Sequence, residues 1–342
     1  MENQCKQPAR PDRRAWLSAL LMRRSDHLWP RLALGYARLR GLPRGARARL
    51  RRRTAASLAG VALLLALGAG GLAVPPVTHA SVITVDEVTC TLIDAIRSAN
   101  HDAVYGGCAS GAPGADVIEL TADVTVDAVF EYLRYPRDDG NYDSHGPFGL
   151  PIIRSEVTVN GNGHAVDRDP SAESFGLFGV GGDGDLTLND LTLRNGWNPP
   201  YLGGAVFATG GQVTINRSTF SENMADFGGA IATRDGGQII VNDSVFADNR
   251  AIGGGAILSG IDAQTTINRS MISGNYSWQN GGGLYAYGSD LTLNNSTVSG
   301  NSSRWNGGGI ANYLAGGQVT INNSTVTGNS SELMGGGIYQ VT

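Results

Sequence analysis

A repeat of about 26 residues in the second half of the chain limits the possible folds more than any other feature. A double glycine followed by a small or branched apolar residue recurs at intervals of 25 to 28 residues. It occurs at Gly203-Gly204, Gly228-Gly229, Gly254-Gly255, Gly282-Gly283, Gly308-Gly309 and Gly336-Gly337. A second marker, an apolar residue followed by Asn, recurs at Asn189, Asn216, Asn242, Asn268, Asn294 and Asn322. Because the two markers share one period, they indicate a stack of structural repeats.

Apolar and polar residues alternate inside each period. One period contains Val213–Asn216, then Ser218–Asn223, then Gly229–Ala232. Alternation with period two lets one side of a strand be buried, and the intervening Gly, Asn and Ser residues suit bends. We therefore expect an all-β fold, a parallel β-helix (solenoid) with three short strands in each coil. A propeller blade would need about 40 residues, and the leucine spacing of a leucine-rich repeat is absent.

Stacking also explains the recurring asparagines. When coils stack at about 4.8 Å, identical side chains lie above one another, so we expect a structural ladder of buried amides. Hydrogen bonds along the ladder would satisfy groups that are otherwise costly to bury. Five of the six ladder positions also begin an Asn-x-Ser/Thr sequon, and the ladder accounts for them without glycosylation. The five are Asn216, Asn242, Asn268, Asn294 and Asn322.

Charge divides the chain into segments. Residues 1–53 carry 15 Lys and Arg against 3 Asp and Glu, whereas residues 81–342 carry 11 basic against 27 acidic residues. We predict a disordered basic leader at 1–53. Residues 54–80 then form a signal peptide cleaved after Ala80, or an uncleaved signal-anchor crossing the membrane with residues 55–77. The protein would be secreted or held at the surface of a bacterial envelope. An acidic folded part argues against nucleic acid as a partner.

The exported part begins with a cap region, which we place at 81–116. Thr91–Asn100 has its apolar residues on one helical face and predicts a short capping helix. Cys90 and Cys108 are expected to form a disulfide, since the compartment is oxidising. The β-helix follows at 117–342.

The C-terminal end of the β-helix is expected to be incomplete, because the sequence stops part-way through a coil. Either the chain is part of a longer one, or a partner covers the last coil; otherwise we expect a monomer. Residues 131–149 are rich in Tyr, Asp, Gly and Pro, and predict a loop that projects from an early coil.

Two stretches of sequence carry a family resemblance. Cys90-Thr91-Leu92-Ile93-Asp94-Ala95-Ile96, followed by Ala99-Asn100, resembles the CSLREA region that opens many bacterial β-helix proteins, with departures at Thr91, Ile93 and Asp94. The repeats resemble those of polymorphic outer membrane proteins, which pair a Gly-Gly-Ala-Ile tetrad with Phe-x-x-Asn, here Phe220–Asn223 and Phe246–Asn249. The resemblance implies a right-handed parallel β-helix. It also implies a non-catalytic, adhesin-like surface protein that binds glycan or protein partners through turns and loops.

The alternative functions are a polysaccharide lyase or glycoside hydrolase, and a structural surface spacer. An enzyme would need clustered carboxylates. The best cluster lies in the projecting loop, where a solvated acidic loop is the simpler interpretation. Its residues are Arg134, Arg137, Asp138, Asp139, Asp143 and His145. Gly181–Asp185 resembles the start of a calcium repeat, but the sixth position is Leu186, so we expect a turn.

We therefore predict no catalytic residue, no cofactor and no metal site. Exposed aromatics remain as the candidates for ligand contact. Trp278 and Trp305 are 27 residues apart, close to one repeat, which makes them candidates for a shared face; chance spacing or packing is the alternative interpretation.

Overall fold

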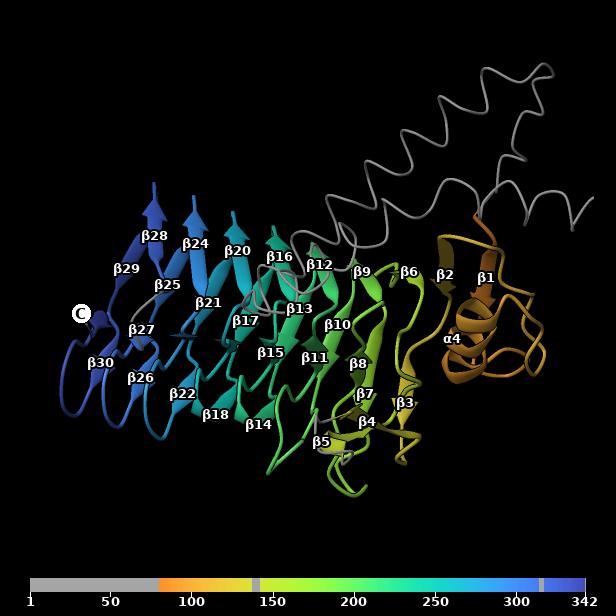
Figure 1. Cartoon of the computed structure of the whole chain (residues 1–342), viewed down its shortest axis with the longest axis horizontal. Helices are drawn as coiled ribbons and strands as arrows, with labels where there is room; N and C mark the ends of the chain where they lie inside the picture. Colours follow the sequence, from red (N-terminus) through yellow and green to blue (C-terminus); the bar gives the residue numbers. More distant parts are fainter. Residues whose placement is uncertain (1–79, 137–141, 314–316, 342) are drawn as a thin grey trace, which may run out of the picture. The chain divides into compact units, whose positions relative to one another are not determined.

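The computed structural model describes residues 80–136, 142–313 and 317–341, all within one compact unit, Ala73–Thr342. Successive coils of this unit each add one strand to several sheets (Figure 1). The strands that stack coil on coil pair in parallel, as a parallel β-helix requires. The expected fold class is confirmed.

Two of the sheets carry the alternating segments recognised in the sequence. Sheet A has nine strands: β1 (Val82–Val85), β2 (Asp116–Leu120), β6 (Glu156–Asn160), β9 (Asp185–Asn189), β12 (Gln212–Asn216), β16 (Gln238–Asn242), β20 (Gln264–Asn268), β24 (Asp290–Asn294) and β28 (Val319–Asn322). Sheet B has eight: β3 (Val124–Val126), β7 (Ala165–Arg168), β10 (Thr192–Arg194), β13 (Thr219–Ser221), β17 (Val245–Ala247), β21 (Met271–Ser273), β25 (Thr297–Ser299) and β29 (Thr325–Thr327).

Two further sheets complete each regular coil, which runs from sheet A through B and E to D. Sheet E has β14 (Met224–Phe227), β18 (Arg250–Gly253), β22 (Tyr276–Ser277), β26 (Ser302–Ser303) and β30 (Ser330–Ser331). Sheet D has β8 (Phe178–Val180), β11 (Val206–Thr209), β15 (Ile231–Arg234), β19 (Ile257–Ser259), β23 (Leu284–Tyr287), β27 (Ile310–Tyr313) and β31 (Ile338–Gln340). The expectation of three strands per coil was wrong. Sheet E was missed because its strands are only 2 to 4 residues long.

The core is made of apolar rows that run through the stacked coils. In β12, Val213 and Ile215 are buried, whereas the other three residues of the strand are half-buried. The register places Val213 beside Leu186 of β9 and Ile239 of β16. Burying one such side chain contributes about 1.5–3 kcal/mol. Each coil is stabilised by its neighbours, because a single coil cannot bury these side chains alone.

The paired glycines have two different roles. The first turns the chain with a positive φ, which is 64° at Gly228 and 68° at Gly254. The second lies against the next coil: a Cβ on Gly229 would come within 2.2 Å of the carbonyl oxygen of Gly255. Glycine is therefore required once for conformation and once for close approach. In the last three coils the turn position is taken by the glycine before the pair, namely Gly281, Gly307 and Gly335, with φ of 67°, 66° and 65°.

The N-terminal end of the solenoid is covered by α4 (Leu92–His101), as expected (Figure 1). The Thr91 hydroxyl caps the helix by accepting a hydrogen bond of 3.2 Å from the Asp94 N–H. Asn100 ties the helix to a later coil, since its amide donates to the Ile152 carbonyl at 2.8 Å. Strand β1 precedes the helix and pairs with β2, so sheet A begins at Val82, inside the range that we had assigned to the cap.

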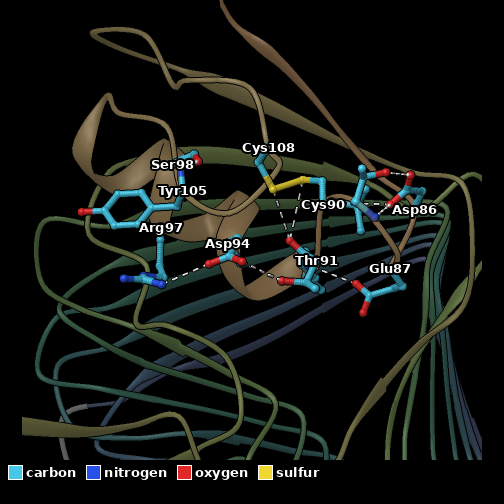
Figure 2. Close-up of a disulfide and its surroundings, with 12 residues drawn as sticks. Asp86, Glu87, Cys90, Thr91, Asp94, Arg97, Ser98, Tyr105 and Cys108 are labelled. Carbon is cyan, nitrogen blue, oxygen red and sulfur yellow. Dashed lines mark hydrogen bonds and ion pairs between the residues drawn. A yellow bond between two sulfur atoms is a disulfide. The ribbon is translucent and has the colours of Figure 1, made fainter.

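The expected disulfide between Cys90 and Cys108 is present beside the start of α4 (Figure 2). Both cysteines are buried and belong to the hydrophobic core. The bond fixes the loop that follows the helix to the residue that precedes it. The disulfide thus closes the cap on itself, and the cap is held on the coils by packing in the hydrophobic core.

A β-hairpin occupies the stretch that we had expected to be a projecting loop. It consists of β4 (Glu131–Pro136) and β5 (Tyr142–Phe148), which pair in antiparallel orientation. Leu133 and Phe148 belong to a second apolar cluster, which includes Phe207 on sheet D and is separate from the main core. Because Leu133 and Phe148 are buried in this cluster, the described parts of the two strands pack onto the coils.

Candidate binding groove

A hollow with a volume of about 410 Å³ lies on the surface of the coils, at the junction of sheets B and E. Its lining residues are Asp248, Arg250, Gly274, Tyr276 and Trp278. We call this hollow the groove. The volume lies within the range of about 300–1,000 Å³ that is usual for small-ligand sites. Its lining combines aromatic surface with one carboxylate and one guanidinium group.

The strand register brings the walls of the groove together. Arg250 of β18 pairs with Tyr276 of β22 on the next coil. Ser277 between the two aromatic residues is buried, so Tyr276 and Trp278 point away from the core. Trp278 is 36% exposed. Its indole ring meets the Tyr276 ring edge-on, with ring centroids 5.1 Å apart and planes at 87°. This packing holds the partly exposed indole in a defined orientation.

The hollow exists because glycine replaces an acidic residue at one turn position. Asp248 and Gly274 lie at equivalent turns on successive coils, with φ of 57° and 67°. A Cβ on Gly274 would lie 2.9 Å from Oδ1 of Asp248, so a side chain there would enter the space beside the carboxylate. Glu222 occupies the same turn one coil earlier, with φ of 57°. The groove therefore begins where the row of acidic side chains stops.

Asp248 and Arg250 differ from most charged residues on the coil turns. Within the described residues, neither has an ion pair or a side-chain hydrogen bond to another group. By contrast, Arg217 binds Asp190 of the preceding coil through two hydrogen bonds of 2.7 and 2.6 Å. Arg269 binds Asp243 in the same way. The charged groups of the groove thus remain available to a ligand, while those of the neighbouring turn neutralise each other.

Trp305 lies near the groove but not in line with Trp278. The Arg304 N–H donates to the Ser277 carbonyl at 3.0 Å, and the Trp305 N–H donates to the Gln279 carbonyl at 2.9 Å. Arg304 is therefore the residue beside Trp278, and Trp305 is one position further along. The tryptophans are 27 residues apart, whereas Tyr276 and Ser302 are paired at an offset of 26. The two side chains are both exposed on adjacent coils, but they do not form one row.

A second hollow of about 410 Å³ lies between the hairpin and the turn that leads into β9. It contains Glu131 and Asp183 together with Arg134 and Arg154. The Glu131 carboxylate accepts hydrogen bonds from the Ile152 N–H at 3.0 Å and from Arg154 Nη1 at 3.1 Å. Partial burial raises the pKa of Glu131, but these hydrogen bonds outweigh that effect and keep the pKa below its ordinary value. Glu131 is therefore an ionised carboxylate that fixes the hairpin, and not a proton donor at neutral pH.

Most of the acidic cluster identified in the sequence lies outside the described residues. Arg137, Asp138 and Asp139 lie outside the described residues, as does the side chain of Asp143. His145 is buried, with its ring centroid 5.3 Å from that of Phe207. The described residues therefore do not bring this cluster together as a site.

The glycine-rich segment before β9 forms a turn, in which the Gly184 N–H donates to the Gly181 carbonyl at 3.0 Å. The Asp185 carboxylate accepts a hydrogen bond from the Gln212 amide at 3.0 Å. Among the residues that the structure describes, no group of three or more His, Cys, Asp or Glu is placed to hold a metal ion.

The six asparagines identified in the sequence form a ladder along the outer side of sheet A. The Asn216 amide donates to Asn189 at 2.8 Å, and the Asn242 amide donates to Asn216 at 2.9 Å. The side chains are half-buried or, at Asn322, exposed. The expectation that they are buried was wrong, because each follows an inward-facing residue and so faces outward.

The fully buried ladder is a different one, made by the Asn of Phe-x-x-Asn and its equivalents. Its fully buried members are Asn223, Asn249, Asn275 and Asn301, and the row ends at the half-buried Asn329. Asn249 is 0% exposed, and its Oδ1 accepts both the backbone N–H and the amide of Asn223 at 3.0 Å. The amide of Asn249 donates to Asn275 and to the Phe220 carbonyl. This row lies at the turn from sheet B to sheet E and holds that turn in place on every regular coil.

Sequence reasoning missed Asp248, Arg250 and Tyr276 as groove residues. One feature of the sequence could have revealed them. The turn position between sheets B and E is acidic at Glu222 and Asp248 and is glycine on the later coils. The glycines are Gly274, Gly300 and Gly328. The change is visible only once the positions are aligned by the buried asparagine that follows each of them.

The leader at 1–53 and nearly all of the segment 54–80 lie outside the described residues. Among the described residues there is no helix with the length and apolar character needed to cross a membrane.

Comparison with known proteins defines the class. Residues 176–342 match the family described as right handed beta helix region. The match covers the regular coils that carry the groove and leaves the cap and the hairpin outside it. Together with the parallel sheets, it makes this chain a right-handed parallel β-helix repeat protein. No curated protein and no solved structure matches the chain.

Proposed function

We propose that this protein is exported and non-catalytic, and that it acts in an adhesin-like manner by binding neutral glycans in the groove. The observation that carries the proposal is the exposed Trp278 side chain, packed at 87° against Tyr276 and flanked by the unpaired Asp248 and Arg250. An aromatic face covers the apolar side of a sugar ring, while carboxylate oxygens accept from hydroxyl groups and guanidinium N–H groups donate to them.

The charge of the groove favours a neutral ligand over an ionic one. Asp248 and Arg250 contribute one negative and one positive charge to the same hollow. A strongly acidic or strongly basic ligand would be attracted by one of them and repelled by the other. A hydroxyl group serves both, because it can donate to the carboxylate and accept from the guanidinium.

Export is supported by two features that are independent of the groove. A disulfide is expected to persist in an oxidising compartment. The order of basic, apolar and small residues before residue 81 is typical of a secretory signal. The resemblance to CSLREA and polymorphic outer membrane protein repeats agrees with a surface location, and that assignment stays a prediction.

The test is binding of the purified chain to an array of neutral and acidic glycans, with Trp278→Ala as the decisive variant. We expect the wild type to bind neutral glycans and the variant to lose roughly tenfold or more in affinity, as for the loss of an aromatic anchor. Tyr313→Ala is the matched control, because Tyr313 is a similarly exposed aromatic at 38%, on sheet D rather than in the groove. Equal binding by Trp278→Ala and wild type would contradict the proposal.

A saccharide-release assay on the same glycans tests the non-catalytic part. We expect no release of reducing sugar or unsaturated product above the background of a heat-denatured sample. Release that depends on the folded chain would identify a lyase or hydrolase instead and would overturn the proposal.

A further inference from the structure

The residues at the groove positions change from one coil to the next, and this change bears on which part of a polymer would fit. On the coil of Asp248, a carboxylate, a guanidinium and an apolar side chain occupy successive outward positions, namely Asp248, Arg250 and Ile252. On the next coil the same positions are taken by Gly274, Tyr276 and Trp278. Asp248 and Arg250 therefore border the hollow on the side of the earlier coil, and we call these two side chains the wall.

Beyond the aromatic coil the equivalents of Tyr276 and Gly274 are small. Ser302 pairs with Tyr276, and Ser330 pairs with Ser302, so the Tyr276 position becomes a small hydroxyl on both following coils. The turn position is Gly300 and then Gly328. A Cβ on Gly300 would have no neighbour closer than 4.0 Å, and one on Gly328 none closer than 3.9 Å. The space above these glycines is therefore open.

The open part is flanked along one side by larger side chains. Arg304 lies beside Trp278 in the register, and Glu332 lies beside Arg304, with 3.7 Å between the charged atoms of the two. The hydroxyls of Ser299 and Thr327, at the outer ends of β25 and β29, border the other side. A row of small residues, which we call the channel, thus continues from the groove along the axis of the coils, away from Asp248.

From this geometry we infer that the groove binds the terminal sugar of a neutral glycan chain, with the rest of the chain extending over Gly300 and Gly328. This inference rests on the proposed glycan-binding function and specifies which part of the glycan is recognised. An internal sugar would have to continue through Asp248 and Arg250 in one direction. A terminal sugar ends at that wall, where its hydroxyls meet the carboxylate and the guanidinium.

Two substitutions test the wall and the channel separately. Asp248→Gly removes the carboxylate from the wall, and glycine readily takes the φ of 57° found there. Gly300→Asp places a side chain in the channel, at a turn whose φ of 63° is close to the value that Asp248 itself adopts. Asp262→Gly is the matched control, because Asp262 is an exposed turn residue with φ of 59° on the opposite side of the coil, between sheets D and A.

The probes are glucose and N-acetylglucosamine oligomers of increasing length, titrated into the full chain by calorimetry, with circular dichroism confirming that each variant is folded. We expect one wild-type molecule to bind per oligomer end, whatever the oligomer length. For Asp248→Gly, we expect the number of protein molecules bound per oligomer to rise with oligomer length. Gly300→Asp should keep binding of the monosaccharide and lose roughly tenfold or more in affinity for the longer oligomers. The control should behave as the wild type.

The outcomes separate the two claims. If the number of wild-type molecules bound per oligomer rises with oligomer length, internal sugars are recognised. The inference is then overturned, while glycan binding stands. If Gly300→Asp binds long oligomers as tightly as the wild type, the channel is not used and the inference is again overturned. If no oligomer binds, the proposed function fails, and the inference fails with it.

Discussion

Replacing Asn249 by alanine should destabilise the protein far more than replacing Asn216, although both belong to asparagine ladders with the same period. The Asn249 side chain makes hydrogen bonds with three residues, and it is completely buried. Its four side-chain hydrogen bonds comprise two accepted from Asn223 and one each donated to Asn275 and Phe220. At about 1 kcal/mol for each lost bond, and with the Asn223 N–H left buried without its acceptor, we expect a loss of about 4 kcal/mol.

Asn216 is expected to contribute much less. Its side chain makes two ladder hydrogen bonds, one to Asn189 and one from Asn242. Because the side chain is half-buried on the outer side of sheet A, water can replace both partners in the variant. We therefore expect Asn216→Ala to cost about 1 kcal/mol or less.

Equilibrium unfolding in urea, followed by circular dichroism, measures the difference between Asn249→Ala and Asn216→Ala. The wild type, both variants and the double variant should be compared at one protein concentration. Since the stability of a solenoid is distributed over its repeats, hydrogen exchange at the Asn223 amide gives a local readout beside the global one. We expect that amide to exchange faster only when Asn249 is replaced. Equal destabilisation by the two substitutions would show that burial does not separate the two ladders.

Three further predictions follow from the packing of the coils and the cap. Gly255→Ala should lower the thermal midpoint more than Gly182→Ala, because a Cβ on Gly255 would lie 2.1 Å from the next coil's Gly282 carbonyl oxygen, whereas one on Gly182 would have no neighbour closer than 3.8 Å, and neither glycine has a positive φ; differential scanning calorimetry of both variants checks this. Cys108→Ser should cost about 3 kcal/mol, since the disulfide closes a loop with a sequence separation of 18, and adding reductant to the wild type in the same unfolding experiment should reproduce the loss. Glu131→Gln should destabilise the protein at neutral pH: the lowered pKa of Glu131 gives stability that is fully present above the ordinary value of 4.5 and is lost as the pH falls through the folded-state pKa, so wild-type and variant unfolding midpoints should converge in acid.

Much of the fold could be predicted from the sequence because stacking copies each residue's environment from coil to coil. Val213, Leu186 and Ile239 are chemically similar because all three face the same interior, and the period shows this directly. The capping helix and the cysteine pair were predictable for a local reason. Their spacing in the chain is short, so helical periodicity and cysteine count are enough.

The groove and the fourth sheet could not be predicted in the same way. A strand of two residues such as Tyr276–Ser277 is too short to show alternation. The burial of Asn223 rather than Asn216 depends on which side of a turn faces the core, and both asparagines have the same period. The offset between Trp278 and Trp305 is a single residue, which only the strand register resolves.

The contrast between neighbouring turn rows explains why recognition is assigned to one of them. The turn between sheets A and B carries Asp190, Arg217, Asp243 and Arg269 on successive coils, and each arginine binds the aspartate of the preceding coil. Such a row is complete in itself, because every charge has a partner within the chain. The turn between sheets B and E departs from this rule at Asp248, whose row then changes to glycine. The stacking of the coils does not require this replacement of an acidic residue by glycine. The unpaired Asp248 beside the row of glycines is therefore the reason that the proposed ligand site is assigned to this turn.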